Sequence, residues 1–348
     1  MKRNSTSRKA HLLIFLSILS ILFSCSSGKT FNFEVPSANN SIRQSLVSVD
    51  IPDNFGHVKP ILYKKEGRVK KEIACQAGTR ADGSSCLYWI HENSTETGTE
   101  YILQERSEKP ETSPIMKIED NGRSLVFRHG EKKIINYHYA RMPQPDGAED
   151  CFGRSGFIHP VWSPQGSVLT RIQPEDHIEQ YGVFMPWAQM EYNGKIYDSW
   201  NLGKNQGTVK AGSVLSKEEG PVFSRCSMSL GHYISDKGQE IKIMDEIWTI
   251  RAYAMDDYFM WDFESALTPC TTFPVLLKKY NYGGFSWRLT EDWKAEVSQM
   301  MTSEGDGIRR ASGKKARWIY TEGSARNGIE SGFIIMSDPA NFNHPETL

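Results

Sequence analysis

The sequence predicts an all-β protein, in which a large antiparallel β-sandwich of supersandwich-like build follows a smaller N-terminal β-module. Short runs rich in β-branched and aromatic residues recur along the chain, and turn pairs such as Asp82-Gly83 and Asn121-Gly122 separate them. Helical spacing of apolar residues is confined to residues 291–301, where we expect the single helix. Short strands at regular intervals favour an antiparallel sandwich over alternating strands and helices.

The first 24 residues have the pattern of a bacterial lipoprotein signal peptide. Basic residues between positions 2 and 9 precede an apolar stretch at 12–23, which ends in the lipobox-like Leu22-Phe23-Ser24-Cys25. This stretch is short for a membrane span, so cleavage is favoured over an uncleaved anchor. We expect Cys25 to be the acylated mature N-terminus and the protein's only membrane attachment.

Residues 25–43 are expected to form a flexible tether between the lipid and the folded protein. Ser26 and Ser27 follow Cys25 without an acidic cluster, and no later apolar run reaches the length of a membrane span. We therefore expect the protein in the cell envelope, anchored to the outer membrane and facing the periplasm.

Two β-modules are expected after the tether, at residues 44–140 and 141–348. Pro143, Pro145 and the acidic run at 146–150 mark the boundary between them. The strands expected in the first module lie at 45–51, 86–90, 101–104, 124–127 and 134–139. Those expected in the second lie at 239–255, 258–266, 284–289, 316–320 and 332–336.

The longest expected strand, near residues 239–254, is largely apolar on both faces and carries charge on both. Asp245 lies on one face and Glu246 on the other, because successive side chains of a strand alternate. This pattern favours the middle of a sheet, with one face on the core and the other lining a cleft.

Charge and cysteine content exclude two classes of function. The formal net charge is -1, with both signs interspersed and no basic stripe, so we expect no nucleic-acid partner. Five cysteines besides Cys25 show no C-x-x-C pair, which makes a structural zinc site improbable. Cys75 and Cys86 could form a disulfide, but two buried thiols are the favoured interpretation.

Residues 157–202 concentrate the chemistry of the chain. They hold His159, Arg171 and the pair Asp176-His177 close to the tryptophans Trp187 and Trp200. Aromatic faces stack on the C–H surfaces of sugars, while charged groups bond sugar hydroxyls, so this composition favours a sugar or glycoside ligand.

Three hypotheses for this site stay open. The first is an enzyme with His159 and His177 as acid or base, Asp176 and Glu246 as their partners, and Arg171 or Arg288 opposite developing negative charge. The second is a non-catalytic glycan-binding protein, with Arg171, Trp187, Trp200, Arg288 and His344 as ligand contacts. The third, weaker hypothesis makes His159, Asp176, His177 and His344 ligands of one metal ion. The sequence identifies neither a cofactor nor an oligomeric state.

Several blocks of the sequence are similar to those of a bacterial family. They read Phe157-Ile158-His159-Pro160, Pro174-Glu175-Asp176-His177, Asp198-Ser199-Trp200-Asn201, Gly283-Gly284-Phe285 and His344-Pro345-Glu346. In this order they resemble the PmoA-like family, labelled "methane oxygenase", from about Gln44 to the C-terminus. The chain departs from that pattern at 178–182 and ends at Leu348, where the resemblance implies missing last strands and an uncovered sheet edge. Methane oxidation is not expected, since no spanning helices follow residue 24.

Overall fold

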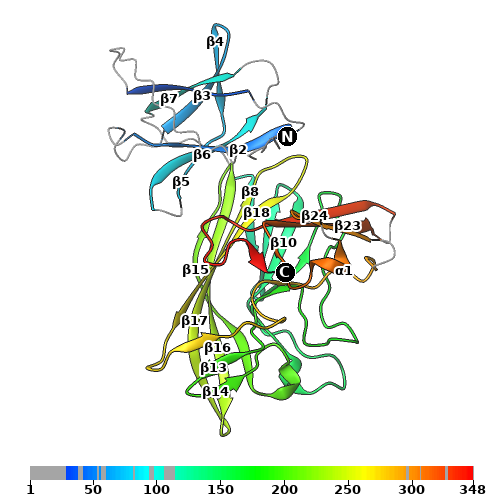
Figure 1. Ribbon diagram of the computed structural model, residues 1–348. Helices are drawn as coiled ribbons and strands as arrows, with labels where there is room; N and C mark the ends of the chain where they lie inside the picture. Colours follow the sequence, from blue (N-terminus) through cyan, green and yellow to red (C-terminus); the bar gives the residue numbers. More distant parts are fainter. Residues whose placement is uncertain are drawn as a thin grey trace, which may run out of the picture. The chain divides into compact units, whose positions relative to one another are not determined.

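The computed structural model describes residues 29–37, 42–52, 55, 60–80, 83–93, 98–105, 114–294, 298–305, 307–325 and 328–347. Antiparallel strands dominate these ranges, which confirms the all-β fold class. The chain forms two compact units, residues 1–111 and 112–348, coloured from blue to red along the sequence in Figure 1. Cys25 and the expected signal peptide lie outside the described residues.

The first unit is a small two-layered module. One sheet has the order β1-β7-β3-β4 and the other the order β2-β6-β5. Leu62, Trp89, Tyr101 and Leu103 pack between the two sheets and are almost fully buried. The strands are β1 (Thr30–Val35), β2 (Gln44–Asp50), β3 (Pro60–Glu66), β4 (Val69–Ile73), β5 (Gln76–Thr79), β6 (Ser85–Glu92) and β7 (Thr99–Glu105).

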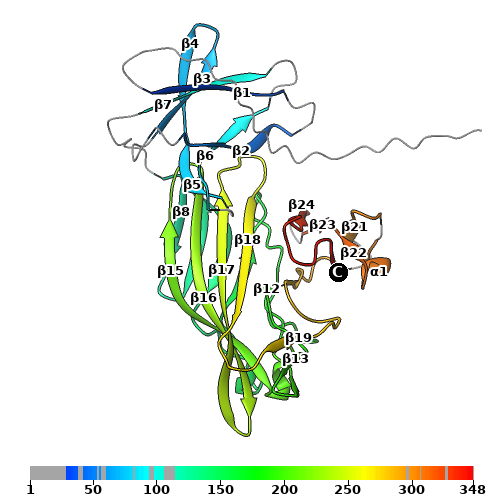
Figure 2. The ribbon, with the colours of Figure 1, turned by 60° about the vertical axis from the view of Figure 1, so that its left-hand side comes forward.

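The second unit is built on two facing sheets, which confirms the expected sandwich. The six-stranded sheet, in the order β20-β12-β11-β10-β9-β8, consists of β8 (Met116–Asp120), β9 (Ser124–His129), β10 (Lys132–His138), β11 (Phe157–Val161), β12 (Val183–Phe184) and β20 (Ser286–Trp287). The four-stranded sheet consists of β15 (Gly207–Glu218), β16 (Phe223–Asp236), β17 (Gln239–Tyr253) and β18 (Met260–Pro269), which run side by side in Figure 2.

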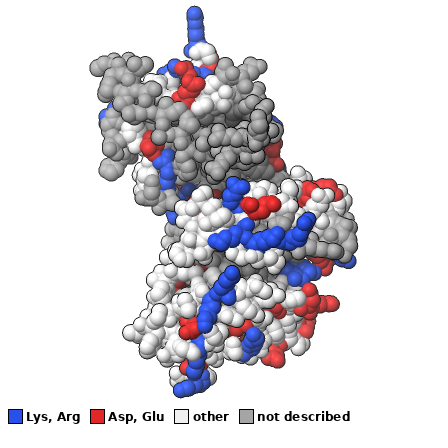
Figure 3. All heavy atoms as spheres, viewed as in Figure 1, with Lys and Arg blue, Asp and Glu red and all other residues white. Residues whose placement is uncertain are grey.

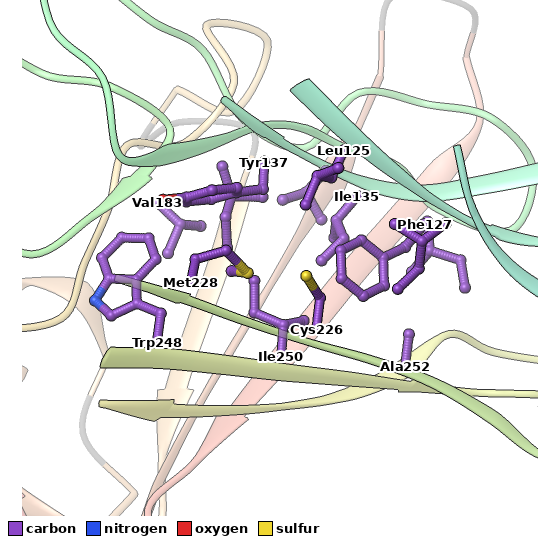
Figure 4. Packing of buried hydrophobic residues seen from close by; sticks show 14 of the residues in the cluster. Leu125, Phe127, Ile135, Tyr137, Val183, Cys226, Met228, Trp248, Ile250 and Ala252 are labelled. Carbon is purple, nitrogen blue, oxygen red and sulfur yellow. The ribbon is translucent and has the colours of Figure 1, made fainter. Parts of the chain in front are cut away.

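The main core lies between these two sheets. Phe127 and Tyr137 project from one sheet toward Met228, Trp248 and Ile250 of the other (Figure 4). Each side chain is at most 1% exposed, and burial of one such group stabilises the fold by about 2 kcal/mol. β17 lies between β16 and β18, as its sequence predicted, and one of its faces points into this core.

The unit boundary differs from the one expected at residue 140. The strands β8, β9 and β10 pair in series and continue through β11 into the six-stranded sheet. They therefore belong to the second unit. The prolines near residue 143 lie in a connection between β10 and β11, within one sheet.

Small sheets and short turns complete the second unit. One sheet joins β14 (Lys195–Tyr197), β13 (Met190–Tyr192) and β19 (Val275–Leu277), a second joins β21 (Ser298–Thr302), β23 (Trp318–Ser324) and β24 (Glu330–Met336), and a third joins β22 (Lys315–Ala316) and β25 (Glu346–Thr347). Within the described part of this unit, the 3-10 turns are η2 (Asp150–Phe152) and η3 (Leu202–Lys204).

The prediction of a helix at 291–301 is wrong. Ser298–Thr302 is the strand β21, which pairs with β23, and its burial alternates along the strand. Across the described ranges, the one α-helical turn is α1 (Ile308–Ala311), and no helix there is long and apolar enough to cross a membrane. Basic and acidic side chains both occur on the face shown in Figure 3.

Candidate functional site

Three chain segments distant in sequence meet at one backbone junction. The amide N–H of Gly182 donates to Arg171 O at 2.9 Å, that of Arg171 to Arg288 O at 3.2 Å, and that of Arg288 to Gly182 O at 2.7 Å. Gly182 has φ +47°, and a Cβ there would lie 2.2 Å from Ile158 O. Only glycine fits this position without strain. The hydrogen bonds of the junction place the backbones of Arg171 and Arg288 side by side.

A groove lies along this junction. Its first part has a volume of about 470 Å³, and the adjoining part about 720 Å³. Both parts share Arg171, Thr290 and Trp293. The first part is also lined by Gln180, Phe184, Trp200, Tyr282, Ser286, Trp287, Arg288 and Leu289, and the second by Glu291, Asp292, Lys294, Ser324 and Ala325.

Aromatic rings form one wall of the groove. The ring centroids of Phe184 and Trp200 are 5.2 Å apart, and those of Trp200 and Tyr282 are 5.3 Å apart. Tyr282 is 51% exposed, whereas Trp200 is 8% exposed. Trp287 stacks on Phe333 with 4.2 Å between centroids, which attaches strand β24 behind the groove. The wall therefore offers an exposed phenol ring backed by rigidly packed indoles.

The carboxylate of Asp198 holds the turn that carries Trp200. It accepts hydrogen bonds from the backbone N–H groups of Trp200 and Asn201, both at 2.9 Å, and from Lys204 Nζ at 2.8 Å. Burial acts to raise the pKa of Asp198, but the bonds from Lys204 and Asn201 outweigh it and lower that pKa. A buried carboxylate paired with an exposed lysine thus fixes one ring of the aromatic wall.

Charged side chains line the other side of the first part of the groove. Arg288 Nη2 donates to both carboxylate oxygens of Asp176, at 3.0 and 3.1 Å, and Arg288 Nη1 donates to Gln180 Oε1 at 3.0 Å. Asp176 also lies 3.1 Å from His177 Nδ1. The hydrogen bonds from His177 and Arg288 lower the pKa of Asp176. A chain of three titratable groups therefore leads from the groove to solvent.

Arg171 lines both parts of the groove without a partner for its side chain. Its Nε is buried and has no hydrogen bond, and the described residues give its guanidinium no ion pair. Burial, and after it the charge of Arg288, lowers the pKa of Arg171. Among the described residues, this guanidinium therefore has no direct partner, and Asp176 acts on it only through its charge.

His159, predicted as an acid or base, lies outside the groove lining. Its Nδ1 is 2.9 Å from Thr170 Oγ1, and its carbonyl oxygen accepts a 2.7 Å bond from His138 Nε2. Burial, followed by the neighbouring His138, lowers the pKa of His159 to about 4. The imidazole is neutral near pH 7 and joins strand β11 to the segment that carries Arg171.

Glu246 is fully buried on the core face of β17, away from the groove. Its carboxylate accepts bonds from His232 Nε2 at 2.8 Å, from Trp248 Nε1 at 2.7 Å and from Ser265 Oγ. These partners belong to β16, β17 and β18, so Glu246 ties three strands together. The prediction that Glu246 assists His159 or His177 has no support in this placement.

Trp187 and His344 also lie outside the groove lining. Trp187 packs against the backbone at Gly283, where a Cβ would lie 2.8 Å from its ring. His344 Nδ1 is 3.2 Å from Ser337 Oγ. Within the described ranges, no three His, Cys, Asp or Glu side chains gather as metal ligands would. The four histidine and aspartate ligands of the metal hypothesis are thus not brought together.

Several contributors to the groove were not selected from the sequence, among them Tyr282, Gln180 and Asp198. The signal for Asp198 was present, because Asp followed by Ser-Trp-Asn fits a side chain that caps its own turn. Tyr282 and Gln180 gain their roles only through the backbone junction, which no local pattern reveals.

Comparison with known proteins corrects the family assignment. A family model described as a family of unknown function (DUF6807) matches residues 124–348, which is more than half of the chain. The resemblance to a PmoA-like methane oxygenase family is therefore wrong. No curated protein matches the chain. The matched region contains the whole groove, and the chain belongs to this family of unknown function.

Proposed function

We propose that the groove binds a carbohydrate or glycoside. The observation that carries this proposal is the pairing of the Trp200–Tyr282 wall with Arg171, Arg288 and Gln180 across one groove. Aromatic faces accept the C–H surface of a sugar ring, and guanidinium and amide groups bond its hydroxyls. The 51% exposure of Tyr282 leaves its ring accessible to such a ligand.

A catalytic role is the second candidate, and the His177–Asp176–Arg288 chain favours it. Asp176 contacts His177 through Nδ1, and the described residues provide no hydrogen-bond partner for Nε2. A carboxylate at Nδ1 orients an imidazole and leaves its Nε2 available to a ligand. In this candidate mechanism, Nε2 of His177 takes a proton from a water molecule as the water oxygen bonds to the anomeric carbon of the ligand. The bond from that carbon to the leaving oxygen breaks, and His177 returns the proton to the leaving oxygen, while Asp176 stays ionised.

A panel of neutral and acidic oligosaccharides and aryl glycosides tests both candidates with the full chain. Thermal unfolding measures binding, because a ligand that binds only the folded state raises the unfolding midpoint. Chromatography of the same mixtures measures product formation. A raised midpoint without product supports binding alone, and product supports catalysis. If no sugar raises the midpoint or reacts, the proposal is rejected.

We also propose that Cys25 carries the lipid that attaches the protein to the outer membrane, facing the periplasm. The basic segment, short apolar stretch and lipobox-like sequence support this. Cys25→Ser should move the protein from the membrane fraction to the soluble fraction. Retention of this variant as an integral lipoprotein would rule the proposal out.

A further inference from the structure

The first part of the groove contains two guanidinium groups and one nearby carboxylate. Arg171 and Arg288 are its charged lining residues, and they are close enough for Arg288 to affect the titration of Arg171. Asp176 pairs with Arg288 through both oxygens and also contacts His177. Asp176 is bonded directly to Arg288 and acts on Arg171 only through its charge, so two guanidinium groups share one carboxylate.

The adjoining part of the groove contains two acidic residues and one lysine. Glu291 and Asp292 line that part and have interaction partners of their own, and Lys294 lies beside them. The side chain of Arg171 makes no hydrogen bond or ion pair with any described residue, and its Nε is shielded from solvent. A half-buried guanidinium without a partner costs free energy, which an anionic ligand would recover.

We propose that the ligand carries a carboxylate and that Arg171 binds it, so that the groove selects a uronic acid residue over the neutral sugar. This inference rests on the proposed function and specifies its substrate class. The planar guanidinium of arginine matches the two oxygens of a carboxylate and can donate two parallel hydrogen bonds. The sugar ring then stacks on the Tyr282 side of the same groove part.

The geometry also explains why Arg171, and not Arg288, is the carboxylate receptor. Arg288 already donates through Nη1 to Gln180 and through Nη2 to both oxygens of Asp176. Arg171 keeps its donors free, and the backbone junction at Gly182 fixes its place beside the aromatic wall. Arg288 thus supports the site by adding positive potential.

Isothermal titration of the full chain with matched sugars tests the inference. The probes are a disaccharide ending in glucuronate, the same disaccharide ending in glucose, and one ending in glucose 6-sulfate. Arg171→Gln removes the charge, Arg171→Lys keeps the charge without the planar fork, and Arg128→Gln on β9 is the control. Arg128 pairs with Glu119 and lies outside the groove.

The wild-type protein should bind the glucuronate probe at least about tenfold more tightly than the neutral probe. Arg171→Gln should reduce this preference to within about twofold, Arg171→Lys should retain part of it, and Arg128→Gln should leave it unchanged. Equal binding of glucuronate and glucose probes would overturn the inference and leave sugar binding intact. A preference for the sulfate probe alone would also overturn the carboxylate assignment. If none of the probes binds, the inference and sugar binding by this groove both fail.

Discussion

His159 and His177, the two histidines predicted to act as acid or base, differ in their burial and in their hydrogen-bond partners. His159 lies on a strand, bonds Thr170, and has its pKa lowered to about 4 by burial. A base with this pKa is poorly matched to proton transfer near pH 7. His177 is exposed and contacts Asp176 at the edge of the groove. His177 is therefore the better candidate for proton transfer at the groove.

His177→Ala should separate function from stability. The side chain is 50% exposed, so its removal should change the free energy of unfolding by less than about 1 kcal/mol. The same variant should abolish ligand binding or turnover, measured against the sugar that the wild type prefers. Unfolding of the variant, or unchanged binding and turnover, would show that His177 is structural or incidental.

Glu246→Ala, in contrast, should strongly reduce the stability of the protein. Removing a fully buried carboxylate leaves His232 and Trp248 without their acceptor, and we expect a loss of about 3–5 kcal/mol of unfolding free energy. Glu240→Ala on the same strand is the control, since its exposed pair with Lys210 contributes less than about 1 kcal/mol. Denaturant titrations of both variants measure the difference. Equal stability of the two would contradict the structural role of Glu246.

Sequence patterns located some site residues and misplaced others for a physical reason. The dense block at 157–202 nominated Arg171, Asp176 and Trp200, which the structure places in or beside one groove. Glu246 was nominated because a charge on an apolar strand stands out. Alternation assigns a charged residue to a face but does not show which face packs on the core.

The turn at Asp198 determines how the aromatic wall responds to pH. The pKa of Asp198 is lower in the folded protein than its unfolded value of about 3.9, so the ionised form stabilises the fold. This contribution is fully present above the unfolded pKa and is lost as the pH falls through the lower, folded pKa. Acid should therefore loosen the turn that carries Trp200.

Asp198→Asn should remove this part of the acid sensitivity. The variant should lose about 1–3 kcal/mol at pH 7, because Lys204 and two backbone N–H groups lose a charged acceptor. Below the folded pKa of Asp198, the two proteins should converge in stability. Denaturant titrations between pH 2 and pH 7 measure both curves. Parallel curves over the whole range would exclude a stabilising role for the ionised Asp198.

The backbone junction depends on glycine at position 182. Gly182→Ala adds a Cβ that would lie 2.2 Å from Ile158 O at a positive φ, so it should cost more than about 2 kcal/mol and displace Arg171 and Arg288. Gly166→Ala is matched in φ sign but meets no atom within 4 Å, and should cost about 1 kcal/mol. Thermal denaturation compares the two. If Gly182→Ala is no more destabilising than Gly166→Ala, the junction tolerates a side chain.

Long elements were easier to predict than short ones. The run expected at 239–255 contains the strand β17, a fifteen-residue element long enough to leave a strong pattern in the sequence. The stretch at 291–301 was predicted to be helical because Trp293 and Val297 fit helical spacing. In the structure, Trp293 precedes the strand β21 and stacks on Phe333. A tertiary aromatic contact outweighed local periodicity there.

At the scale of the molecule, the sequence pattern predicted the sandwich but did not predict the boundary between the two units. Pairing between β10 and β11 joins residues on both sides of the prolines near 143. Proline and acidic residues mark a surface connection, and the same composition serves a loop within a sheet as well as a linker between units. The groove was likewise hidden, since it forms where residues 170–172, 181–184 and 286–290 meet.

Titration of the full-length protein with the preferred oligosaccharide of the panel tests the central claim, that the aromatic groove is the binding site. Tyr282→Ala removes an exposed ring of the groove, and Phe342→Ala removes a ring that is 99% exposed outside it. We predict that Tyr282→Ala raises the dissociation constant by about tenfold or more, equivalent to about 1.4 kcal/mol, and that Phe342→Ala leaves it unchanged. Unchanged binding by Tyr282→Ala at intact stability would contradict the account.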